Sequence, residues 1–441
     1  MDTRAIDQAA LTPQAGPGQE RKSEATEPTD EQVDHLITHI KDWSITHGLQ
    51  LKLIRLETET TVPSRGINVT VLPTPYPKRC FDEAQRLQPL YNELYMRAAS
   101  QPDWLHSVIE PLLEYDELAK ALWEIWTQVR DAGGGSNVVA ALFRSDYMLH
   151  QPAASVAVSI KQVEMNTFSC SGACHAERVA RLHGHLRRAG GLQKEGESSS
   201  PLPVNSPTRG IIGLLYDAHR LYEAKAFELR KVDRPFCVLM VVQPLNFNIA
   251  DERPIEYGLW DVDVPCFRME WLEVLSRTNL DEDRRLFYDH FGSEYEVSVI
   301  YYRAGYDAAE YSTQAGRDTR LELEMSRAFK CPDVLTHLTG FKVVQAALCA
   351  PGFVERFLPT RSNAEVQAVF DTFMTMQALD STVAGVEARK LATDPETAKD
   401  FVLKPNLEGG GHNIYGAAIP DFLASIPEEQ WGTYQFGRIC E

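Results

Sequence analysis

The sequence lacks long apolar runs and any excess of basic residues. No segment reaches the roughly 18 consecutive apolar residues that a membrane-spanning helix requires. Lysines and arginines number 44 against 62 aspartates and glutamates, which gives a formal net charge of −18. Nucleic acids and anionic membranes attract basic surfaces, so this balance disfavours both as partners. The first residues contain no apolar core of a signal peptide, so we expect a cytoplasmic protein with a disordered tail over residues 1–29.

The sequence also lacks the cysteine pairs that build disulfide frameworks or zinc sites. Its eight cysteines are scattered along 441 residues, mostly in apolar contexts, which is typical of a reducing compartment. Cys170, Cys174 and His175 lie close enough in sequence to suggest a metal site. Zinc sites usually begin with tighter Cys-x-x-Cys pairs and need further ligands, so we favour unliganded side chains here.

A Walker A loop is absent too, although residues 401–416 read FVLKPNLEGGGHNIYG. In a Walker A loop the lysine follows the glycines, whereas here it precedes them. The apolar run Phe401–Leu403 predicts a short buried strand that ends at Lys404. Lys404, Glu408 and the glycines Gly409–Gly411 would suit a nucleoside triphosphate with Mg²⁺, because glycine amides can form a phosphate-binding nest. An exposed glycine turn with a solvated Glu408 explains this stretch equally well.

The chain is long enough for two or three domains. Helical periodicity starts after Thr29, and residues 85–130 predict a helical pair. Residues 153–166 predict a strand pair or hairpin, and residues 191–209 predict a polar loop.

The pattern changes at about residue 235. The run FCVLMVVQ over residues 236–243 is typical of a strand in a parallel sheet that is covered on both faces. A helix is expected from Asp251, and a hairpin over residues 284–306 leads into another buried strand. Helices are expected again over residues 317–349 and 362–378.

Several polar residues stand out within apolar runs. Glu164 and Asn166 lie two apart at a predicted strand end, so both side chains share one face and offer the hard oxygens that Mg²⁺ prefers. Arg144 and Arg303 each interrupt an apolar run, where a guanidinium needs a carboxylate or phosphate partner. The alternatives are an ion pair between Arg144 and Asp146, an interface salt bridge at Arg303, and a solvated sheet edge at Glu164.

Five motifs occur in one order along the chain: RSDYM, VEMNTFSCSG, YYRAGY, KCPDVLTHLTGFKVVQ and FVLKPNLEGGGHNIYG. Because it contains these motifs in this order, the chain resembles the eukaryotic glutathione synthetases from about residue 30 to residue 434. The resemblance implies a mixed α/β and α+β protein with an ATP-grasp fold and an inserted α/β substrate-binding domain. It implies a helical and β part over 30–234, the insert over 235–341, and an ATP-binding part over 342–441.

The resemblance also implies the activity and its chemistry. Members of the family are ATP- and Mg²⁺-dependent ligases that join γ-glutamylcysteine to glycine through an acyl phosphate, the second step of glutathione biosynthesis. They are usually cytosolic homodimers. In such a reaction positioning and charge neutralisation carry the rate, because little covalent work falls to the protein.

Site residues follow from their places in the family motifs. The implied Mg²⁺ ligands are Glu164, Asn166 and Glu408. The implied ATP-binding residues are Glu164, Lys342, Lys404, Glu408, Gly409, Gly410, Gly411, Asn413 and Tyr415. The implied γ-glutamylcysteine-binding residues are Arg144, Phe168, Ser169, Cys170, Ser171, Asn246, Asn248, Glu252, Arg303 and Tyr306. Arg144 and Lys404 are the implied catalytic residues.

The chain departs from the family mildly at His412, where an asparagine is usual, and more strongly in two other places. Asn246 and Glu252 stand where the family has a glutamate and a glutamine, which moves an acidic group across the pocket. After Tyr434 the family continues with an apolar strand that holds the adenine, whereas this chain reads QFGRICE. We therefore expect a C-terminally incomplete ATP-grasp fold in which one sheet edge is unpaired.

Two hypotheses remain open from the sequence. The first is a ligase of glutathione synthetase type. The second is a non-catalytic relative that binds γ-glutamylcysteine or glutathione, or that dimerises with a complete subunit.

Overall fold

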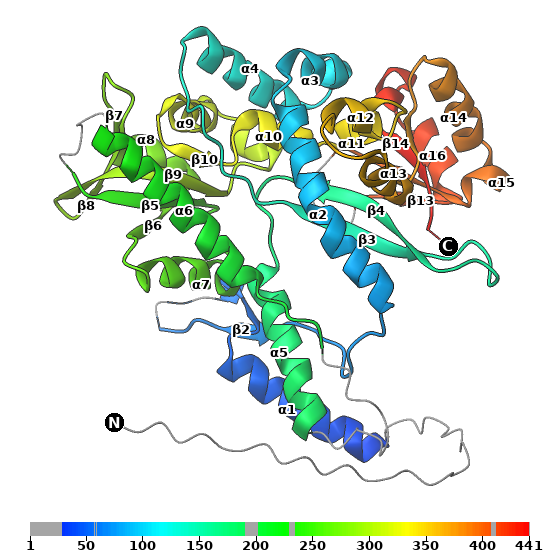
Figure 1. Ribbon diagram of the computed structural model, residues 1–441, viewed down its shortest axis with the longest axis horizontal. Coiled ribbons are helices and arrows are strands. Elements are labelled where there is room, and N and C mark those ends of the chain that lie inside the picture. Colours follow the sequence, from blue (N-terminus) through cyan, green and yellow to red (C-terminus); the bar gives the residue numbers. More distant parts are fainter. Residues whose placement is uncertain are drawn as a thin grey trace.

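The structure is a computed structural model that describes residues 29–56, 58, 60–189, 202–228, 234–406 and 412–440. Three predictions fall wholly or mostly outside these residues: the tail over 1–29, the polar loop over 191–209, and the roles of Glu408 and Gly409–Gly411. Figure 1 shows a broad upper body that carries a narrower N-terminal extension.

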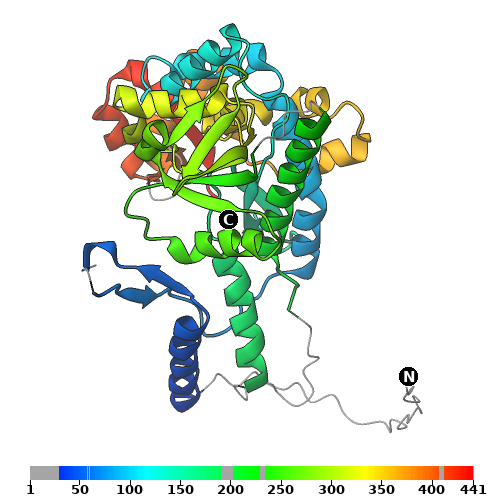
Figure 2. The ribbon, with the colours of Figure 1, turned by 90° about the vertical axis from the view of Figure 1, so that its left-hand side faces the viewer.

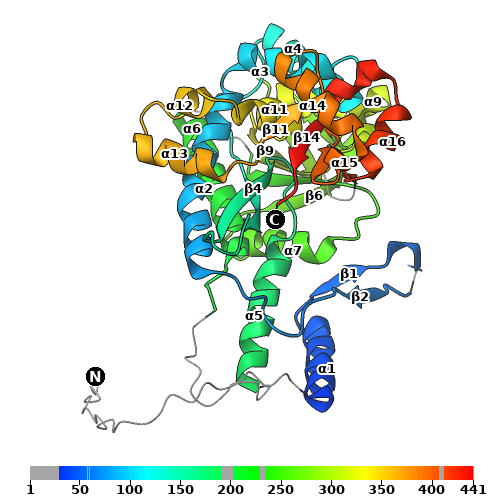
Figure 3. The same cartoon turned by 90° about the vertical axis from the view of Figure 1, so that its right-hand side faces the viewer.

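The N-terminal extension consists of two helices and a small hairpin. Helix α1 (Asp30–Thr46) begins at Thr29, whose side chain forms a capping box with Gln32. The helix is followed by Gly48, which adopts a left-handed conformation at φ +65°. Strands β1 (Gln50–Lys52) and β2 (Ser64–Gly66) pair antiparallel, with the short 3₁₀ helix η1 (Ile54–Leu56) between them. Helix α1 packs against α5 (Ala173–Ala189), and the two are seen side by side in Figure 3.

A helical layer follows in sequence. The expected helical pair over 85–130 is instead three helices, α2 (Lys78–Ala99), α3 (Pro102–Ile109) and α4 (Glu117–Asp131), with the turn η2 (Glu110–Leu112) after α3. Proline is favoured in the first turn of a helix, and Pro102 starts α3 in this way. Helices α10 (Val334–Thr339), α11 (Lys342–Leu348), α12 (Phe353–Phe357) and α13 (Asn363–Thr372) complete the layer.

A six-stranded sheet forms the centre of the body. Its order is β6 (Cys266–Glu270), β5 (Phe236–Val242), β9 (Ser293–Arg303), β8 (Leu286–His290) and β7 (Thr278–Leu280), and β10 (Phe329–Cys331) also pairs with β9. The pairings of β5 with β6 and β9 are parallel, as is that of β10 with β9. The predicted hairpin over 284–306 is confirmed as β8 and β9.

Helices cover both faces of this sheet. Every residue of β5 is buried, as the continuous apolar run predicts. Val238 and Met240 face α6 (Pro207–Glu228) and α7 (Ile249–Trp260), while Cys237 and Leu239 face the core that contains α4 and α9 (Gln314–Met325). We predicted no element where α6 lies; Figure 2 shows it along one side of the sheet. Shorter elements complete this unit: η3 (Trp271–Glu273), α8 (Val274–Arg277) and η4 (Ala308–Tyr311).

Strands β3 (Arg144–His150) and β4 (Ser159–Asn166) form a two-stranded antiparallel ribbon. The predicted hairpin over 153–166 therefore corresponds to a single strand, β4, whose partner comes from the preceding run. The register places Arg144 opposite Asn166 and Asp146 opposite Glu164, with an irregularity between Asp146 and Tyr147.

The last unit is a four-stranded antiparallel sheet in the order β11 (Met376–Ala378), β14 (Gln435–Arg438), β12 (Phe401–Lys404) and β13 (Ile414–Tyr415). Its core is closed by α14 (Val383–Thr393), α15 (Pro395–Ala398), α16 (Ala418–Ala424) and the turn η5 (Glu428–Thr433). The expected helix over 362–378 ends at Thr372, and β11 follows.

The expectation of a missing strand after Tyr434 is wrong. Residues Gln435–Arg438 form β14, which lies between β11 and β12 rather than leaving the edge of β12 unpaired. Phe436 stacks on Phe401 with their ring centroids 4.4 Å apart, so β14 also contributes to the small core of this unit.

No helix among the described residues is long and apolar enough to cross a membrane.

Candidate active site

Two cavities of about 210 Å³ each lie along β4. The Lys404 cavity lies where β4 and α11 meet the four-stranded sheet, and all the described residues predicted to bind ATP line it: Glu164, Lys342, Lys404, Asn413 and Tyr415. The Arg303 cavity lies between the loop after β4 and the six-stranded sheet, and the residues predicted to bind the dipeptide all line it: Arg144, Phe168, Ser169, Cys170, Ser171, Asn246, Asn248, Glu252, Arg303 and Tyr306.

Strand alternation explains why Lys404 points into its cavity. Val402 and Lys404 both line the cavity, while Leu403 between them is buried in the core of the four-stranded sheet. The Nζ atom of Lys404 donates a hydrogen bond to the backbone carbonyl of Val163 at 2.9 Å. The lysine therefore connects its sheet to β4.

A second lysine faces the same cavity from another element. Lys342, the first residue of α11, donates from Nζ to Oε1 of Glu164 at 2.7 Å. Burial lowers the pKa of Lys404, and the nearby charge of Lys342 lowers this pKa further. Among the residues that the structure describes, two ammonium groups and the Glu164 carboxylate lie at this cavity, which favours a polyanionic ligand.

Hard oxygen atoms gather where β3 and β4 pair. Glu164 and Asn166 lie on one face of β4, and Asp146 lies across from Glu164 on β3. The Nδ2 atom of Asn166 donates to Asp146 Oδ2 at 3.3 Å. Among the described residues no three His, Cys, Asp or Glu side chains converge to hold a metal ion. Glu164 and the amide oxygen of Asn166 are the donors that fit Mg²⁺ here.

Arg144 is anchored by Asp146. Its Nε and Nη2 atoms donate to the two carboxylate oxygens at 2.8 and 3.0 Å, and Nη1 donates to the carbonyl of Ser171 at 3.2 Å. Although burial acts to lower it, the pKa of Arg144 is raised by the hydrogen bond and charge of Asp146. The ion pair that the sequence left as an alternative is therefore formed. With this ion pair formed, 42% of the Arg144 side chain is still exposed, and Arg144 lines the cavity.

The loop Phe168–Ser171 is fixed by contacts with neighbouring helices. The ring of Phe168 stacks on His337 at 3.7 Å between centroids, and the guanidinium of Arg320 lies 4.9 Å from the same ring. Ser169 has a left-handed backbone at φ +48°, which is unusual for a residue with a side chain. The carboxylate of Asp251 on α7 accepts hydrogen bonds from the backbone amides after this loop.

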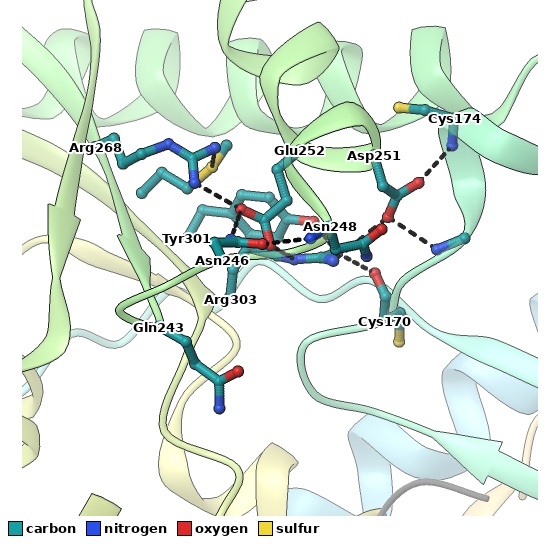
Figure 4. A network of polar contacts seen from close by, with 12 residues as sticks. Cys170, Cys174, Gln243, Asn246, Asn248, Asp251, Glu252, Arg268, Tyr301 and Arg303 are labelled. Atoms are coloured by element: carbon teal, nitrogen blue, oxygen red, sulfur yellow. Dashed lines mark hydrogen bonds and ion pairs between the residues drawn. The ribbon is translucent and has the colours of Figure 1, made fainter. Parts of the chain in front are cut away.

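Arg303 lies at the end of β9 and is only 4% exposed. It donates to the carbonyl of Cys170, to Glu252 Oε1 at 3.3 Å and to Asp251 Oδ2 at 3.4 Å, as Figure 4 shows. Although burial acts to lower it, the pKa of Arg303 is raised by Tyr301 and the two carboxylates. Its ion pairs lie within the chain, in contrast to the interface salt bridge left open by the sequence.

Cys170 and His175, which the sequence suggested as part of a metal site, contact other groups instead. The thiol of Cys170 points to the carbonyls of Leu142 and Asn166, both at 3.3 Å. His175 Nε2 lies 3.1 Å from Oδ1 of Asn248, a residue of the Arg303 cavity.

Two residues of the Arg303 cavity were not predicted from the sequence. Gln243 and Phe247 line it, and Gln243 accepts a hydrogen bond from the hydroxyl of Tyr306 at 2.8 Å. Gln243 follows the carboxyl end of β5, where ligands commonly bind in open α/β sheets, so its position offered a usable signal. Arg268 contacts Glu252 from β6, and nothing in its local sequence marks this contact.

Comparisons with known proteins agree on one family. The family model described as "Eukaryotic glutathione synthase, ATP binding domain" matches residues 30–437. The glutathione synthetase large chain of Schizosaccharomyces pombe is 34% identical over 420 residues, covering 92% of this chain and 82% of that one. The glutathione synthetase of Homo sapiens is 32% identical over 401 residues, covering 91% and 80%.

A solved structure has the same fold. The apo structure of a glutathione synthetase-like effector from Globodera pallida superposes with a TM-score of 0.71 at 19% sequence identity, covering 94% of this chain and 83% of that one. At this identity the likeness shows the fold alone.

Proposed function

We propose how this chain, which belongs to the eukaryotic glutathione synthase family, carries out glutathione synthesis. The chain is a ligase of glutathione biosynthesis, and we assign it the ATP-dependent joining of γ-glutamylcysteine to glycine. The observation that carries this assignment is the meeting of the two cavities on β4. Glu164 lines one cavity and Asn166 lines the other. Two residues along a strand span about 7 Å, so groups bound on either side lie within reach of one another.

The Lys404 cavity takes the triphosphate of ATP. Lys342 and Lys404 come from different elements and would neutralise the phosphates as point charges. Phosphoryl transfer depends on such neutralisation and on alignment of the reacting groups. Asn413, just before β13, and Tyr415, on β13, would line the nucleotide. The Asn413 amide lies 3.3 Å from the Tyr415 hydroxyl.

Mg²⁺ would be held by Glu164 and Asn166, together with Glu408 outside the described residues. When bound, it would neutralise phosphate charge. Glu164 accepts the hydrogen bond of Lys342, which keeps the carboxylate oriented toward the cavity.

The Arg303 cavity takes γ-glutamylcysteine. Arg144 stands at the side nearest β4 and would bind the cysteinyl carboxylate, which then attacks the γ-phosphorus and becomes an acyl phosphate with loss of ADP. The amine of glycine attacks the acyl carbon, and phosphate leaves as the peptide bond forms. Asp146 keeps the Arg144 guanidinium in place for both steps. We also propose that the protein acts in the cytoplasm as a homodimer, as its family does.

The test is glycine-dependent release of ADP by the purified chain with ATP, Mg²⁺ and γ-glutamylcysteine. We expect turnover that requires glycine, and a loss of at least about a hundredfold in Lys404→Ala, since positioned charges typically contribute two or more orders of magnitude. A folded chain that binds γ-glutamylcysteine in calorimetry without any turnover would overturn the ligase assignment in favour of the non-catalytic alternative. That alternative is not favoured, because relatives named glutathione synthetase align over about nine-tenths of the chain.

A further inference from the structure

The wall of the Arg303 cavity contains a carboxylate held between two arginines. Glu252 is 3% exposed. Its Oε1 atom accepts from Arg303, while its Oε2 atom accepts from Arg268 Nη1 at 2.8 Å and from Asn246 Nδ2 at 2.6 Å. Figure 4 shows Arg268 approaching Glu252 from the side away from Gln243, a residue that lines the cavity. Glu252 and Asn246 are two of the positions at which the sequence departs from the motifs of the family it resembles.

Arg268 is itself tightly held. It lies on β6 with 13% of its side chain exposed, and it contacts Glu256 on α7 through Nε at 3.1 Å and Nη2 at 2.9 Å. Arg268 is not among the residues that line the Arg303 cavity. Arg268 is connected to the cavity wall by its contact with Glu252.

The ion pairs form one connected and balanced network. Three guanidinium groups (Arg253, Arg268 and Arg303) alternate with three carboxylates (Asp251, Glu252 and Glu256), so their formal charges cancel. Removing Arg268 would leave one uncompensated negative charge beside the cavity. A buried charge without its partner interacts strongly with its surroundings, because little water screens it.

This matters for the substrate assigned by the proposed function. γ-Glutamylcysteine carries two carboxylates and one ammonium group at neutral pH, and its net charge is negative. We propose that Arg268 is a positioning residue for this substrate: it neutralises and orients Glu252, so that the cavity wall formed by Glu252 and Arg303 presents no excess negative charge to the anionic substrate. The inference rests on the proposed function.

The test compares steady-state kinetics of three variants. Arg268→Met should raise KM for γ-glutamylcysteine about tenfold, equivalent to about 1.4 kcal/mol, while KM for ATP stays within about twofold. The double variant Glu252→Gln/Arg268→Met removes one charge of each sign and should recover most of the lost affinity. Arg253→Met is the matched control, because Arg253 contacts Glu256 but not Glu252 and its side chain is 39% exposed.

Calorimetry with γ-glutamylcysteine alone separates this inference from the proposed function. If the wild-type chain binds the dipeptide without turnover, the ligase assignment fails while the three affinities still test Arg268. An equal loss in Arg268→Met and Arg253→Met, or no recovery in the double variant, would overturn the inference. A melting temperature measured for each variant shows whether Arg268→Met stays folded, and Arg268→Lys, which keeps the charge, should lose less affinity than Arg268→Met.

Discussion

At the scale of single residues, the two lysines of the Lys404 cavity differ in their surroundings. Lys342 has a carboxylate partner, Glu164, at 2.7 Å, whereas Lys404 Nζ donates to a backbone carbonyl. An ammonium beside a second ammonium, removed from water and hydrogen-bonded to a neutral group, loses its proton more readily than in solution. The pKa of Lys404 is accordingly below its ordinary value of 10.5.

This setting predicts the alkaline side of the pH profile. Phosphate binding needs the charged form of Lys404, and this form is lost as the pH rises through the lowered pKa. The value of kcat/KM for ATP, which reports groups of the free enzyme, should therefore fall at a pH below 10.5. Lys404→Arg keeps its charge throughout this range, so in that variant the fall should move to higher pH. An unchanged profile in Lys404→Arg would assign the alkaline limb to another group.

At the scale of elements, α6 shows how a helix is fixed on the central sheet. Its buried positions Ile211, Leu215, Ala218 and Tyr222 recur at helical spacing and pack on β5 and β9. Two polar contacts lie within this apolar interface: the Tyr222 hydroxyl donates to Glu296 Oε1 at 2.6 Å, and His219 contacts Ser298. His219 Nδ1 is 2.7 Å from Ser298 Oγ, which itself donates to the carbonyl of Cys237, so the imidazole must be the donor to the serine.

The docking of α6 should make stability depend on pH. Burial lowers the pKa of His219 from 6.5 to about 4. Because the unfolded chain takes up the proton first, the stabilisation is complete above pH 6.5 and is lost as the pH falls from 6.5 towards 4. The loss should reach at most about 3 kcal/mol. Urea unfolding at pH 7 and pH 4.5 should show a smaller pH effect in His219→Gln than in the wild type, while His412→Gln, at an exposed position, should behave as the wild type does.

At the scale of the whole molecule, the site depends on how the four-stranded sheet is attached to the rest. Asn406 follows β12 and is 8% exposed. Its Oδ1 accepts from the backbone amide of Val343 in the first turn of α11 at 3.4 Å, and its Nδ2 donates to Asp116, the N-cap of α4, at 3.1 Å. One side chain thus joins the sheet that carries Lys404 to the helix that carries Lys342.

Breaking this junction should loosen the molecule and weaken ATP binding. Asn406→Ala leaves two half-buried polar groups without this partner, which should lower the free energy of unfolding by about 1 kcal/mol. We also expect a higher KM for ATP than for the wild type, with little change for γ-glutamylcysteine. Urea unfolding and steady-state kinetics measure the two effects, and Asp421→Ala at an exposed position of α16 serves as the control. Equal rises in both KM values would argue against a local role for Asn406.

The sequence alone determined the family, the order of most elements and, through the family motifs, the charged residues that line both cavities. The order of the motifs is sufficient to identify the family. Within a motif, residues two apart on a strand, such as Glu164 and Asn166, share one face. Local patterns also determined the buried strand β5 and the capping of α1. The sequence analysis nevertheless missed α6, although its helical spacing was visible in the chain.

The tertiary structure alone decided the rest. The place of β14 at the centre of its sheet depends on pairing with two strands that lie far from it in sequence. The contact of Arg268 with Glu252 depends on a parallel strand and a crossover helix coming together. Local sequence carries no signal for such contacts, because each group finds its charge partner only after the sheet has assembled around it.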